Sequence, residues 1–300
     1  MLFSIIIPIY NGERVITRLL EKLDRLTRGF TREIIVIDSE SKDGTLEKVE
    51  KVQKYVAGIK IVNILKKKFN HGTTRNLGAK LAKGKFITFV SHDALPRNQK
   101  TFSYFLKDFE IGEKVVAVFT KEVPYKNSPF FQRAEAYCRY QTFDRHSDSN
   151  GLIIQNTTIP FVPLTKENKL LWWGLSNVFS CYRRSFLLKN PFQKVDYGED
   201  LIMGKKIIDL GYTKVYDAKC AVTHSHHYNL LEYYMRQKKD LYLRVNKLKL
   251  GSSLGLLCKI KHIFRSKYSI GQKALYFCEL IPYYLVKALI FVEVKLAVIE

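Results

Sequence analysis

The chain has 300 residues, of which 46% are hydrophobic and 26% are charged. This balance is ordinary for a globular protein, so it excludes a disordered chain, a collagen-like repeat and a small disulfide scaffold. Fifty Lys and Arg residues against 28 Asp and Glu residues give a net charge of +22. Such a charge favours a polyanionic partner, whether nucleic acid, anionic lipid or a phosphorylated substrate.

The first 120 residues alternate between short apolar runs and amphipathic stretches. The predicted strands are Phe3–Ile9, Glu33–Ile37, Ile59–Leu65, Phe86–Val90 and Val115–Thr120. The predicted helices between them are Glu13–Leu26, Thr45–Val56, His71–Ala82 and Arg97–Phe109. The alternation predicts an α/β, Rossmann-like fold with a mostly parallel central sheet and helices on both faces. Ligands bind at the carboxyl ends of the strands in such sheets, so the loops that follow the strands should converge on one site.

The rest of the chain has a different character. Residues 121–228 mix aromatic and polar side chains with frequent Gly, Pro and Asn, and we expect them to extend the same core, giving one domain over 1–228. Eleven Lys and Arg residues face only two acids between 229 and 273, and 274–298 is apolar but interrupted by charges and Pro282. We expect residues 229–300 to be helical. They are typical of a segment on an anionic membrane surface. The alternatives are a solvated face packed on the first domain and, for 274–298, an oligomer helix.

The cysteines and the N-terminal segment indicate where the protein resides. The five cysteines are scattered and form no CxxC pair, which predicts neither a zinc site nor a disulfide framework and favours a reduced, cytosolic protein. The N-terminal MLFSIIIPIYNGE lacks the basic region of a signal peptide. No stretch reaches 18 apolar residues, so we expect no simple membrane-spanning helix.

Polar residues follow three of the predicted strands. Asp38 could accept a hydrogen bond from a pyrimidine N–H or a ribose hydroxyl, or could simply cap a turn. The segment FNHGTTRN places Arg75 near a helix start, a position that favours binding of an anion. A capped helix with an exposed Arg would give the same pattern. Asp93 follows the strand FITFV. A lone carboxylate there could bind an Mg²⁺ ion that also binds a phosphate, or it could cap the next helix.

Two later motifs carry further chemistry. Glu199 and Asp200 precede an amphipathic helix, where they either stabilise its start or supply a general base for an attacking hydroxyl. The segment THSHH holds three histidines in four residues but lacks the HExxH spacing. It indicates a single metal or phosphate contact, for which His224 is the candidate, rather than a three-histidine zinc site.

These segments are more specific as an ordered set than singly. In chain order they are SIIIPIYNGE, VIDSESKDGT, FNHGTTRNLGA, ITFVSHDALP, GED and HSHHY. The set resembles the inverting family 2 glycosyltransferases with the GT-A fold, and FNHGTTRN and SHDALP resemble their rhamnosyltransferase branch. The resemblance covers about residues 1–235. It implies a nucleotide-sugar-binding half over 1–120 and an acceptor-binding half over 121–228.

The resemblance also implies roles for individual residues. It implies a dTDP- or UDP-sugar donor, with Mg²⁺ or Mn²⁺ on its diphosphate. The donor-binding residues it implies are Pro8, Tyr10, Asn11, Glu13, Asp38, Arg75, His92 and Asp93. Asp93 and His224 would hold the metal, and Asp200, next to Glu199, would be the general base of a single displacement that inverts the anomeric centre.

Two departures from the family pattern affect these expectations. The usual DxD element is Ser91-His92-Asp93 here, and its single carboxylate predicts weak metal affinity. The stretch MRQKK, residues 235–239, lacks the Trp that follows in processive synthases, which favours addition of one sugar.

The acceptor is expected to be a glycan or a lipid-linked sugar. Trp172 and Trp173 could stack on a sugar ring and Arg183 could meet a lipid diphosphate, although a packed aromatic layer and a solvated Arg pair explain them equally well. A lipid-linked acceptor would place the enzyme at the cytoplasmic face of the cell membrane as a peripheral protein.

Three other classes remain as alternatives. A sugar-1-phosphate nucleotidyltransferase would need a GxGxRxxP-type loop after the first strand, and PIYNGERV is not one. A nucleic-acid-binding or non-enzymatic membrane-binding protein would account for the charge, but no recognised nucleic-acid module is present, so we expect no nucleic acid partner. A dehydrogenase is disfavoured because no GxGxxG follows the first strand.

Overall fold

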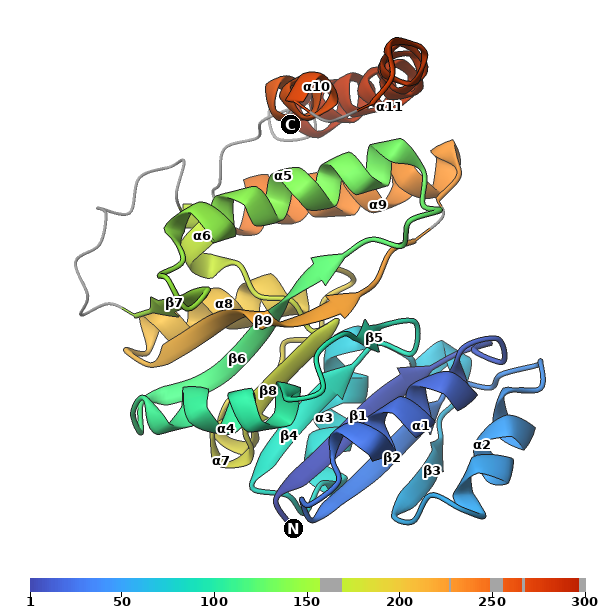
Figure 1. Cartoon of the computed structure of the whole chain (residues 1–300), viewed down its shortest axis with the longest axis vertical. Helices are drawn as coiled ribbons and strands as arrows, with labels where there is room; N and C mark the ends of the chain where they lie inside the picture. The colour runs from blue at the N-terminus through green and yellow to red at the C-terminus, as the bar shows by residue number, and fades with distance from the viewer. Residues whose placement is uncertain (157–168, 227, 249–255, 266–267, 297–300) are drawn as a thin grey trace. The chain divides into compact units, whose positions relative to one another are not determined.

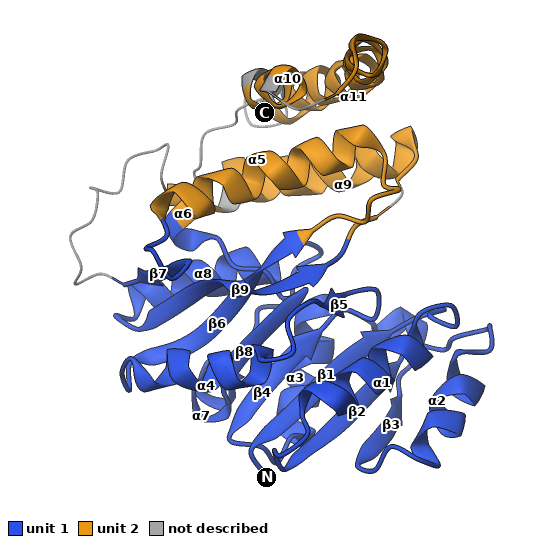
Figure 2. Ribbon diagram, in the orientation of Figure 1, with its two compact units in different colours: residues 1–122, 147–163, 172–224 blue, residues 123–146, 164–171, 225–300 orange. Residues whose placement is uncertain are grey.

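The computed structural model describes residues 1–156, 169–226, 228–248, 256–265 and 268–296 (Figure 1). The chain divides into two compact units (Figure 2). Unit 1 comprises residues 1–122, 147–163 and 172–224, and unit 2 comprises residues 123–146, 164–171 and 225–300.

The N-terminal half of unit 1 is the predicted α/β alternation. Its strands are β1 (Phe3–Ile9), β2 (Arg32–Asp38), β3 (Ile59–Asn63) and β4 (Phe86–Val90). Its helices are α1 (Ile16–Leu26), α2 (Thr45–Gln53), α3 (His71–Leu81) and, after β4, α4 (Thr101–Glu110). Strands β2 and β4 both pair with β1 in parallel, and β3 pairs in parallel with β2. The parallel sheet predicted for this half is therefore confirmed.

The second half of unit 1 adds a reversed strand. Strand β8 (Phe179–Arg183) lies between β4 and β6 (Val115–Val123) and is antiparallel to both. Strand β6 therefore runs in the same direction as β4, and the central sheet remains mostly parallel. Because β8 runs backwards, its first residue lies at the edge where the parallel strands end.

The remaining elements complete the sheet and its helical layers. Strand β9 (Thr213–Thr223) pairs antiparallel with β5 (Leu95–Pro96) and β7 (Leu152–Gln155). The other helices are the short 3₁₀ turn Lys66–Lys68, α6 (Lys169–Trp173), α7 (Arg184–Lys189) and α8 (Glu199–Asp209).

Alternating strand residues separate the two helical layers. One apolar cluster joins Ile5 and Ile7 of β1 to helices α1, α2 and α4. Ile6, on the opposite face of the same strand, lies against α3, where a Cβ on Gly78 would come 2.6 Å from its side chain. Helices therefore cover both faces, as expected for parallel strands.

Unit 2 is helical. It contains α5 (Phe130–His146), α9 (Leu230–Tyr242) with a π turn over Leu243–Lys247, α10 (Leu256–Arg265) and α11 (Ile270–Leu296). Its core residues are Phe130, Phe131, Ala134, Tyr233, Ile263 and Leu280. Helix α5 was not predicted from the sequence, because residues 130–146 carry no single apolar stripe.

One sequence expectation is wrong in unit 2. A disulfide joins Cys138 of α5 to Cys258 of α10, whose Cα atoms are 6.0 Å apart. Spacing alone could not reveal this pair, because the two cysteines are 120 residues apart and meet only through helix packing. Among the described residues, α11 is long and apolar enough to cross a membrane by length and composition alone, with a mean hydropathy of 1.6 over an 18-residue window within Ile270–Val294. A count of uninterrupted apolar residues does not detect this helix, because isolated charged residues interrupt its apolar sequence.

A buried carboxylate joins the start of β1 to the start of β2. Glu33 is almost fully buried and accepts hydrogen bonds from the Ser4 hydroxyl, the Lys83 backbone N–H and the Lys60 ammonium, each at 2.7 Å. Burial by itself raises the pKa of Glu33, but these three donors outweigh it and lower the pKa below the ordinary 4.5. The carboxylate therefore stabilises the fold at neutral pH, and this contribution is lost as the pH falls through the lowered pKa.

We predict that Glu33→Ala lowers the free energy of unfolding at pH 7 by about 2–3 kcal/mol, because it leaves buried donors without an acceptor. Urea unfolding of both proteins measures the difference. Glu47→Ala is the matched control, since its ion pair with Lys51 is solvent-exposed and should change stability by less than about 0.5 kcal/mol. Equal effects of the two substitutions would contradict the prediction.

Candidate active site

The loops after β1 and β2 are tied together by hydrogen bonds. The Asn11 backbone N–H donates to the Ser41 hydroxyl at 2.9 Å, and the Asn11 side-chain oxygen accepts from the Lys42 N–H at 2.8 Å. Asn11 has a φ of 49°, a left-handed conformation that Asn tolerates better than most residues. Asp38 is buried at the end of β2 and accepts from the Ser41 N–H at 3.0 Å. The structure therefore brings Asn11 and Asp38 to one edge of the sheet, as predicted.

The same edge carries two further predicted donor-site residues. The Lys66 ammonium donates to the Tyr10 hydroxyl at 2.7 Å and lies 4.0 Å from the centre of the ring. The hydrogen bond from Lys66 lowers the pKa of the Tyr10 phenol. Glu13 forms an ion pair with Lys48 at 3.2 Å. The Tyr10 ring thus has the Lys66 ammonium fixed beside it.

Pro8 and His92 are neighbours beneath this loop. Burial lowers the pKa of His92, although the Asp93 charge and a hydrogen bond with the Pro8 backbone oppose it. The ring lies so close to Gly12 that a Cβ at that position would come 3.1 Å from its Cδ2 atom. His92 therefore packs under the β1 loop as a mostly neutral ring.

The segment FNHGTTRN forms the start of α3 and holds the loop that leads to α8. Asn70 caps the helix by accepting from the Gly72 and Thr73 N–H groups at 3.1 Å. Asn76 exchanges two hydrogen bonds of 2.9 Å with the Phe192 backbone. Gly72 permits this approach, because a Cβ there would collide with the Gln193 carbonyl.

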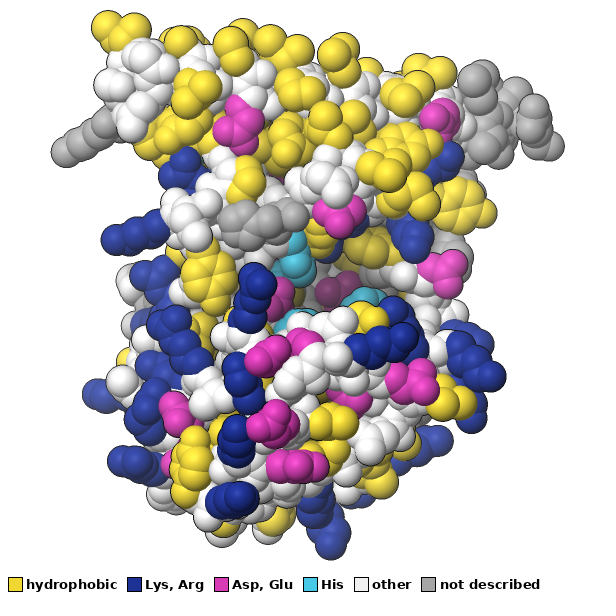
Figure 3. Space-filling view, turned by 90° about the vertical axis from the view of Figure 1, so that its right-hand side faces the viewer, with side chains coloured by type: hydrophobic (Ala, Val, Ile, Leu, Met, Phe, Trp, Pro, Cys, Tyr) yellow, Lys and Arg dark blue, Asp and Glu magenta, His cyan; other side chains and the backbone are white. Residues whose placement is uncertain are grey.

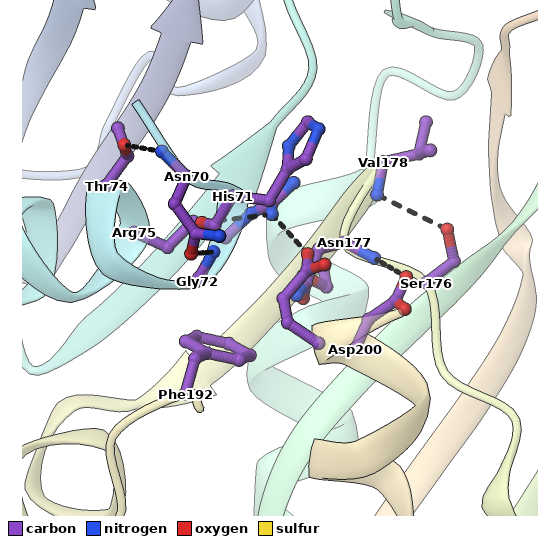
Figure 4. Close-up of polar contacts among 12 residues, drawn as sticks. Asn70, His71, Gly72, Thr74, Arg75, Ser176, Asn177, Val178, Phe192 and Asp200 are labelled. Carbon is purple, nitrogen blue, oxygen red and sulfur yellow. Dashed lines mark hydrogen bonds and ion pairs between the residues drawn. The ribbon is translucent and has the colours of Figure 1, made fainter. Parts of the chain in front are cut away.

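Arg75 and the Gly-Glu-Asp motif meet at this junction. Gly198, with a φ of 73°, turns the chain into α8 and places Glu199 and Asp200 in its first turn. The Arg75 guanidinium donates to the Glu199 carboxylate, and both side chains are 7% exposed. Figure 4 shows Asp200 between Arg75 on the α3 side and Ser176 and Asn177 on the other.

The environment of Asp200 favours its neutral form. Burial and the negative charge of Glu199 raise its pKa to about 7, against the opposing charge of Arg75. Asp200 Oδ1 accepts from the Leu201 N–H at 2.8 Å, and Oδ2 lies 3.5 Å from the Asn177 N–H. A carboxyl that titrates near neutral pH is suited to take a proton from a hydroxyl.

A second carboxylate pair is held by His224. The buried His224 ring places Nδ1 2.9 Å from Glu122 Oε2 and Nε2 3.5 Å from Asp93 Oδ1. Burial opposes a charge on the ring, but hydrogen bonds and charges of Asp93 and Glu122 outweigh it and raise its pKa to about 9. The structure therefore brings together Asp93 and His224, which the sequence analysis named as metal ligands.

Asp93 and His224 offer a suitable donor set for a divalent cation, which would displace the proton from Nε2 of His224 on binding. Their ligand atoms lie within 4.8 Å of each other. Carboxylate oxygen and imidazole nitrogen suit Mn²⁺, and Mg²⁺ accepts one carboxylate with phosphate oxygens and water. Glu122, which faces the other ring nitrogen, is placed to fix the orientation of the imidazole.

Glu122 and Ser176 are site residues that the sequence analysis missed. Glu122 Oε1 accepts from the Ser176 hydroxyl at 2.7 Å, and Ser176 precedes Asn177, which faces Asp200. The side chains of Asp93, His224, Glu122 and Ser176 therefore contact one another in turn. The next residue, Asn177, reaches Asp200 through its backbone N–H. The signal for Glu122 was its place two residues after the predicted apolar strand Val115–Thr120, a position like those that marked Asp38 and Asp93.

The predicted acceptor residues are packed within unit 1. Trp172 and Trp173 are 8% and 7% exposed, and the Lys205 ammonium lies 5.1 Å from the Trp173 ring. Arg183 ends β8 opposite Phe86, at the far edge of the sheet, and donates to the carbonyls of Val115 and Phe109 at 2.7 and 2.8 Å. The structure does not bring Arg183 to the site, because β8 runs away from it.

Comparison with known proteins assigns this constellation to a family. Residues 4–189 match the Glycosyl transferase family 2 domain. The chain belongs to glycosyl transferase family 2. The O-antigen chain rhamnosyltransferase RfbN of Salmonella typhimurium is 30% identical over 243 residues, which cover 79% of this chain and 70% of that protein. WbaN of Salmonella anatum, also an O-antigen chain rhamnosyltransferase, is 28% identical over 78% of this chain and 69% of its own.

Solved structures show the same fold. The mannosyltransferase PcManGT of Pyrobaculum calidifontis, in complex with GDP-Man and Mn²⁺, superposes with a TM-score of 0.59 at 14% identity and covers 99% of this chain and 80% of its own. TarS 1–349 of S. aureus, in complex with UDP-GlcNAc, gives 0.55 at 20% identity, covering 94% and 72%. The predicted GT-A fold and the resemblance to the rhamnosyltransferase branch are confirmed, and this family 2 member is a glycosyltransferase.

We predict that Arg75→Ala destabilises the protein by about 3–5 kcal/mol, because it leaves the Glu199 carboxylate buried without its partner. Arg75→Ala combined with Glu199→Ala should recover a large part of this loss, since the unpaired charge is then absent. A double-mutant cycle in urea measures the coupling. Strictly additive effects would show that the two side chains do not depend on each other.

Proposed function

We propose that this glycosyltransferase moves one sugar from a nucleoside-diphosphate sugar to an acceptor hydroxyl by a single displacement that inverts the anomeric centre. The observation that carries the proposal is the path that joins Asp93 to Asp200 through His224, Glu122 and Ser176. It connects a group suited to the leaving diphosphate with a group suited to the attacking hydroxyl. Unit 1, which holds both groups, would be the catalytic domain.

Asp200 is the proposed general base. Its carboxylate would accept the acceptor proton as the hydroxyl oxygen attacks the anomeric carbon, because its pKa of about 7 leaves it largely ionised at slightly alkaline pH. Glu199 and Arg75 hold it in place from one side and Asn177 from the other. Glu199 is thus proposed as a positioning residue, fixed by Arg75.

Asp93 and His224 are the proposed ligands of Mg²⁺ or Mn²⁺. When bound, such an ion supplies positive charge that stabilises the leaving nucleoside diphosphate. The donor would lie over Tyr10, Asn11 and Asp38, where Tyr10 offers a ring for stacking and Asp38 offers carboxylate oxygens. Pro8, Glu13 and His92 would shape the wall of this pocket.

We propose that the donor sugar is rhamnose and that its carrier is dTDP. The two Salmonella relatives are named O-antigen chain rhamnosyltransferases, which supports rhamnose as the sugar and dTDP as its carrier. The words O-antigen chain in the same names support a glycan acceptor, and a lipid-linked acceptor at the cytoplasmic face of the membrane is our proposal. We retain Trp172 and Trp173 as proposed acceptor contacts, made through the small part of each ring that is exposed. Arg183 is no longer proposed as an acceptor contact, because it lies at the opposite edge of the sheet.

Asp200→Asn should lower kcat by about 10²–10⁴-fold, since the amide cannot take the proton. In the unchanged enzyme, kcat/KM should fall about tenfold per pH unit below pH 7, because protonation removes the base. Release of nucleoside diphosphate in the presence of acceptor measures both. Asp209→Asn, an exposed carboxylate of the same helix, is the control and should leave the rate unchanged. Full activity of a folded Asp200→Asn variant would refute the base assignment.

Metal-assisted donor binding is testable by thermal unfolding with dTDP, UDP, GDP and ADP, each with and without Mn²⁺ or Mg²⁺. A nucleotide at 100 times its Kd should stabilise the native state by about 2.7 kcal/mol. We expect the largest shift with dTDP and metal together. Asp93→Asn should lose the metal-dependent part of that shift. A shift that is equal with and without metal would remove the metal role, and a response to GDP or ADP alone would exclude a dTDP donor.

A further inference from the structure

Helix α11 directs its charged residues towards the other helices of unit 2. The Lys287 ammonium lies 2.8 Å from the Glu135 carboxylate of α5, and Glu293 pairs with Lys238 of α9 at 2.7 Å. Glu279 accepts a hydrogen bond of 3.0 Å from the Phe131 backbone N–H. Each of these three charges is therefore satisfied on the inner face of the helix.

Aromatic stacking fixes the same face. Tyr276 stacks on Phe130 with ring centres 4.1 Å apart, and Tyr283 stacks on Phe131 at 4.0 Å. Leu280, Ile290 and Val294 are buried on this side. Helix α11 is thus anchored to α5 and α9 along most of its length, from Tyr276 to Val294.

The outer face of α11 is apolar. The large exposed side chains of α11 are Ile270, Leu275, Phe277, Ile281, Leu285, Leu289, Phe291 and Val292. Leu285, at 67% exposure, and Leu289, at 54%, lie four residues apart and therefore on the same side. Hydrophobic side chains gather at the top of Figure 3, over the helices of unit 2.

This polarity is the reverse of that of a helix in a water-soluble domain. Such a helix buries its apolar stripe and exposes its charges. Here the ion pairs lie on the inner face and the leucines face outward, an arrangement that costs free energy in water and gains it where the surroundings are apolar. A contiguous exposed apolar face of this kind marks an interaction surface.

We propose that this outer face of α11 inserts into the interfacial layer of an anionic lipid bilayer, with the helix in the plane of the membrane. The charge of the neighbouring sequence selects the lipid over a second copy of the chain. Residues 229–273 contain eleven Lys and Arg against two acids, so two copies would repel each other, whereas an anionic surface attracts them. Lys238 and Lys239 of α9 and Lys261 of α10 have exposed side chains in this region.

The inner contacts decide between lying in the membrane and spanning it. A spanning α11 would carry Lys287, Glu293 and Glu135 into hydrocarbon or break their ion pairs, and either change is costly. Lying in the plane keeps every inner contact and buries only the outer side chains. This geometry accounts for a helix that is long enough to span yet is fixed along one side.

Flotation of the full-length protein with vesicles tests the proposal. We expect it to float with vesicles of phosphatidylcholine and phosphatidylglycerol in a 7:3 ratio and to float less with phosphatidylcholine alone. Leu285→Asp combined with Leu289→Asp should reduce the bound fraction more than tenfold. Leu210→Asp is the control, because Leu210 is an exposed leucine of unit 1, at 50% exposure, and this variant should bind like the unchanged protein.

Cys278 allows a second measurement without any change to the apolar side chains. Among the described cysteines outside the disulfide, Cys181 and Cys220 are buried and Cys278 is exposed on α11. An environment-sensitive fluorophore on Cys278 should shift to shorter wavelength and brighten when anionic vesicles are added. The same fluorophore on Leu210→Cys in a Cys278→Ser background should not change.

Several results would overturn the proposal. An unchanged Cys278 fluorophore with anionic vesicles, or equal flotation of the unchanged and double-Asp proteins, would refute insertion of α11. Equal flotation with neutral vesicles would refute the role of charge. A lipid-free dimer by light scattering that the double-Asp variant converts to monomer, with flotation unaffected, would assign the face to a second copy.

Discussion

The rest of the site depends on the contacts of the Glu122 carboxylate, because its two oxygens bind two different parts of the chain. Oε2 faces the His224 ring at 2.9 Å, and Oε1 accepts from Ser176 at 2.7 Å. The first contact orients the ring that faces Asp93. The second fixes the turn that brings Asn177 to Asp200. One partly buried carboxylate thus contacts both the ring beside Asp93, a proposed metal ligand, and the turn beside Asp200, the proposed base.

This arrangement depends on the reversed direction of β8. A parallel strand at that position would end, rather than begin, at the edge where Asp38 and Asp93 lie, and Ser176 would be at the wrong end of the sheet. The same reversal carries Arg183 to the opposite edge, where its guanidinium binds backbone carbonyls. A single topological feature therefore explains both a site residue that the sequence did not reveal and a proposed one that the structure places elsewhere.

Local pattern and local chemistry predict the first half of the protein well. Four apolar runs gave four parallel strands, and the polar residues that end them, Asp38 and Asp93 among them, lie where parallel strands converge. The rest depends on partners far apart in sequence. Ser176 meets Glu122 across 54 residues, and Cys138 meets Cys258 across 120, and no periodicity records such pairs. Helix α5 could not be predicted for a related reason. It packs against both α10 and α11, and its sequence carries no single apolar stripe.

The insertion of β8 also has a consequence for synthesis of the chain. Strands β4 and β6 pair through β8, so neither has its partner on that side until residues 179–183 have left the ribosome. The nascent chain therefore carries two apolar strands with unpaired backbone groups for more than fifty residues after β6 has emerged. At a translation rate of about 5–20 residues per second, this interval lasts on the order of several seconds. Exposed strand edges pair readily with other chains, so a chaperone that shields nascent sheets should matter most to this protein during that interval.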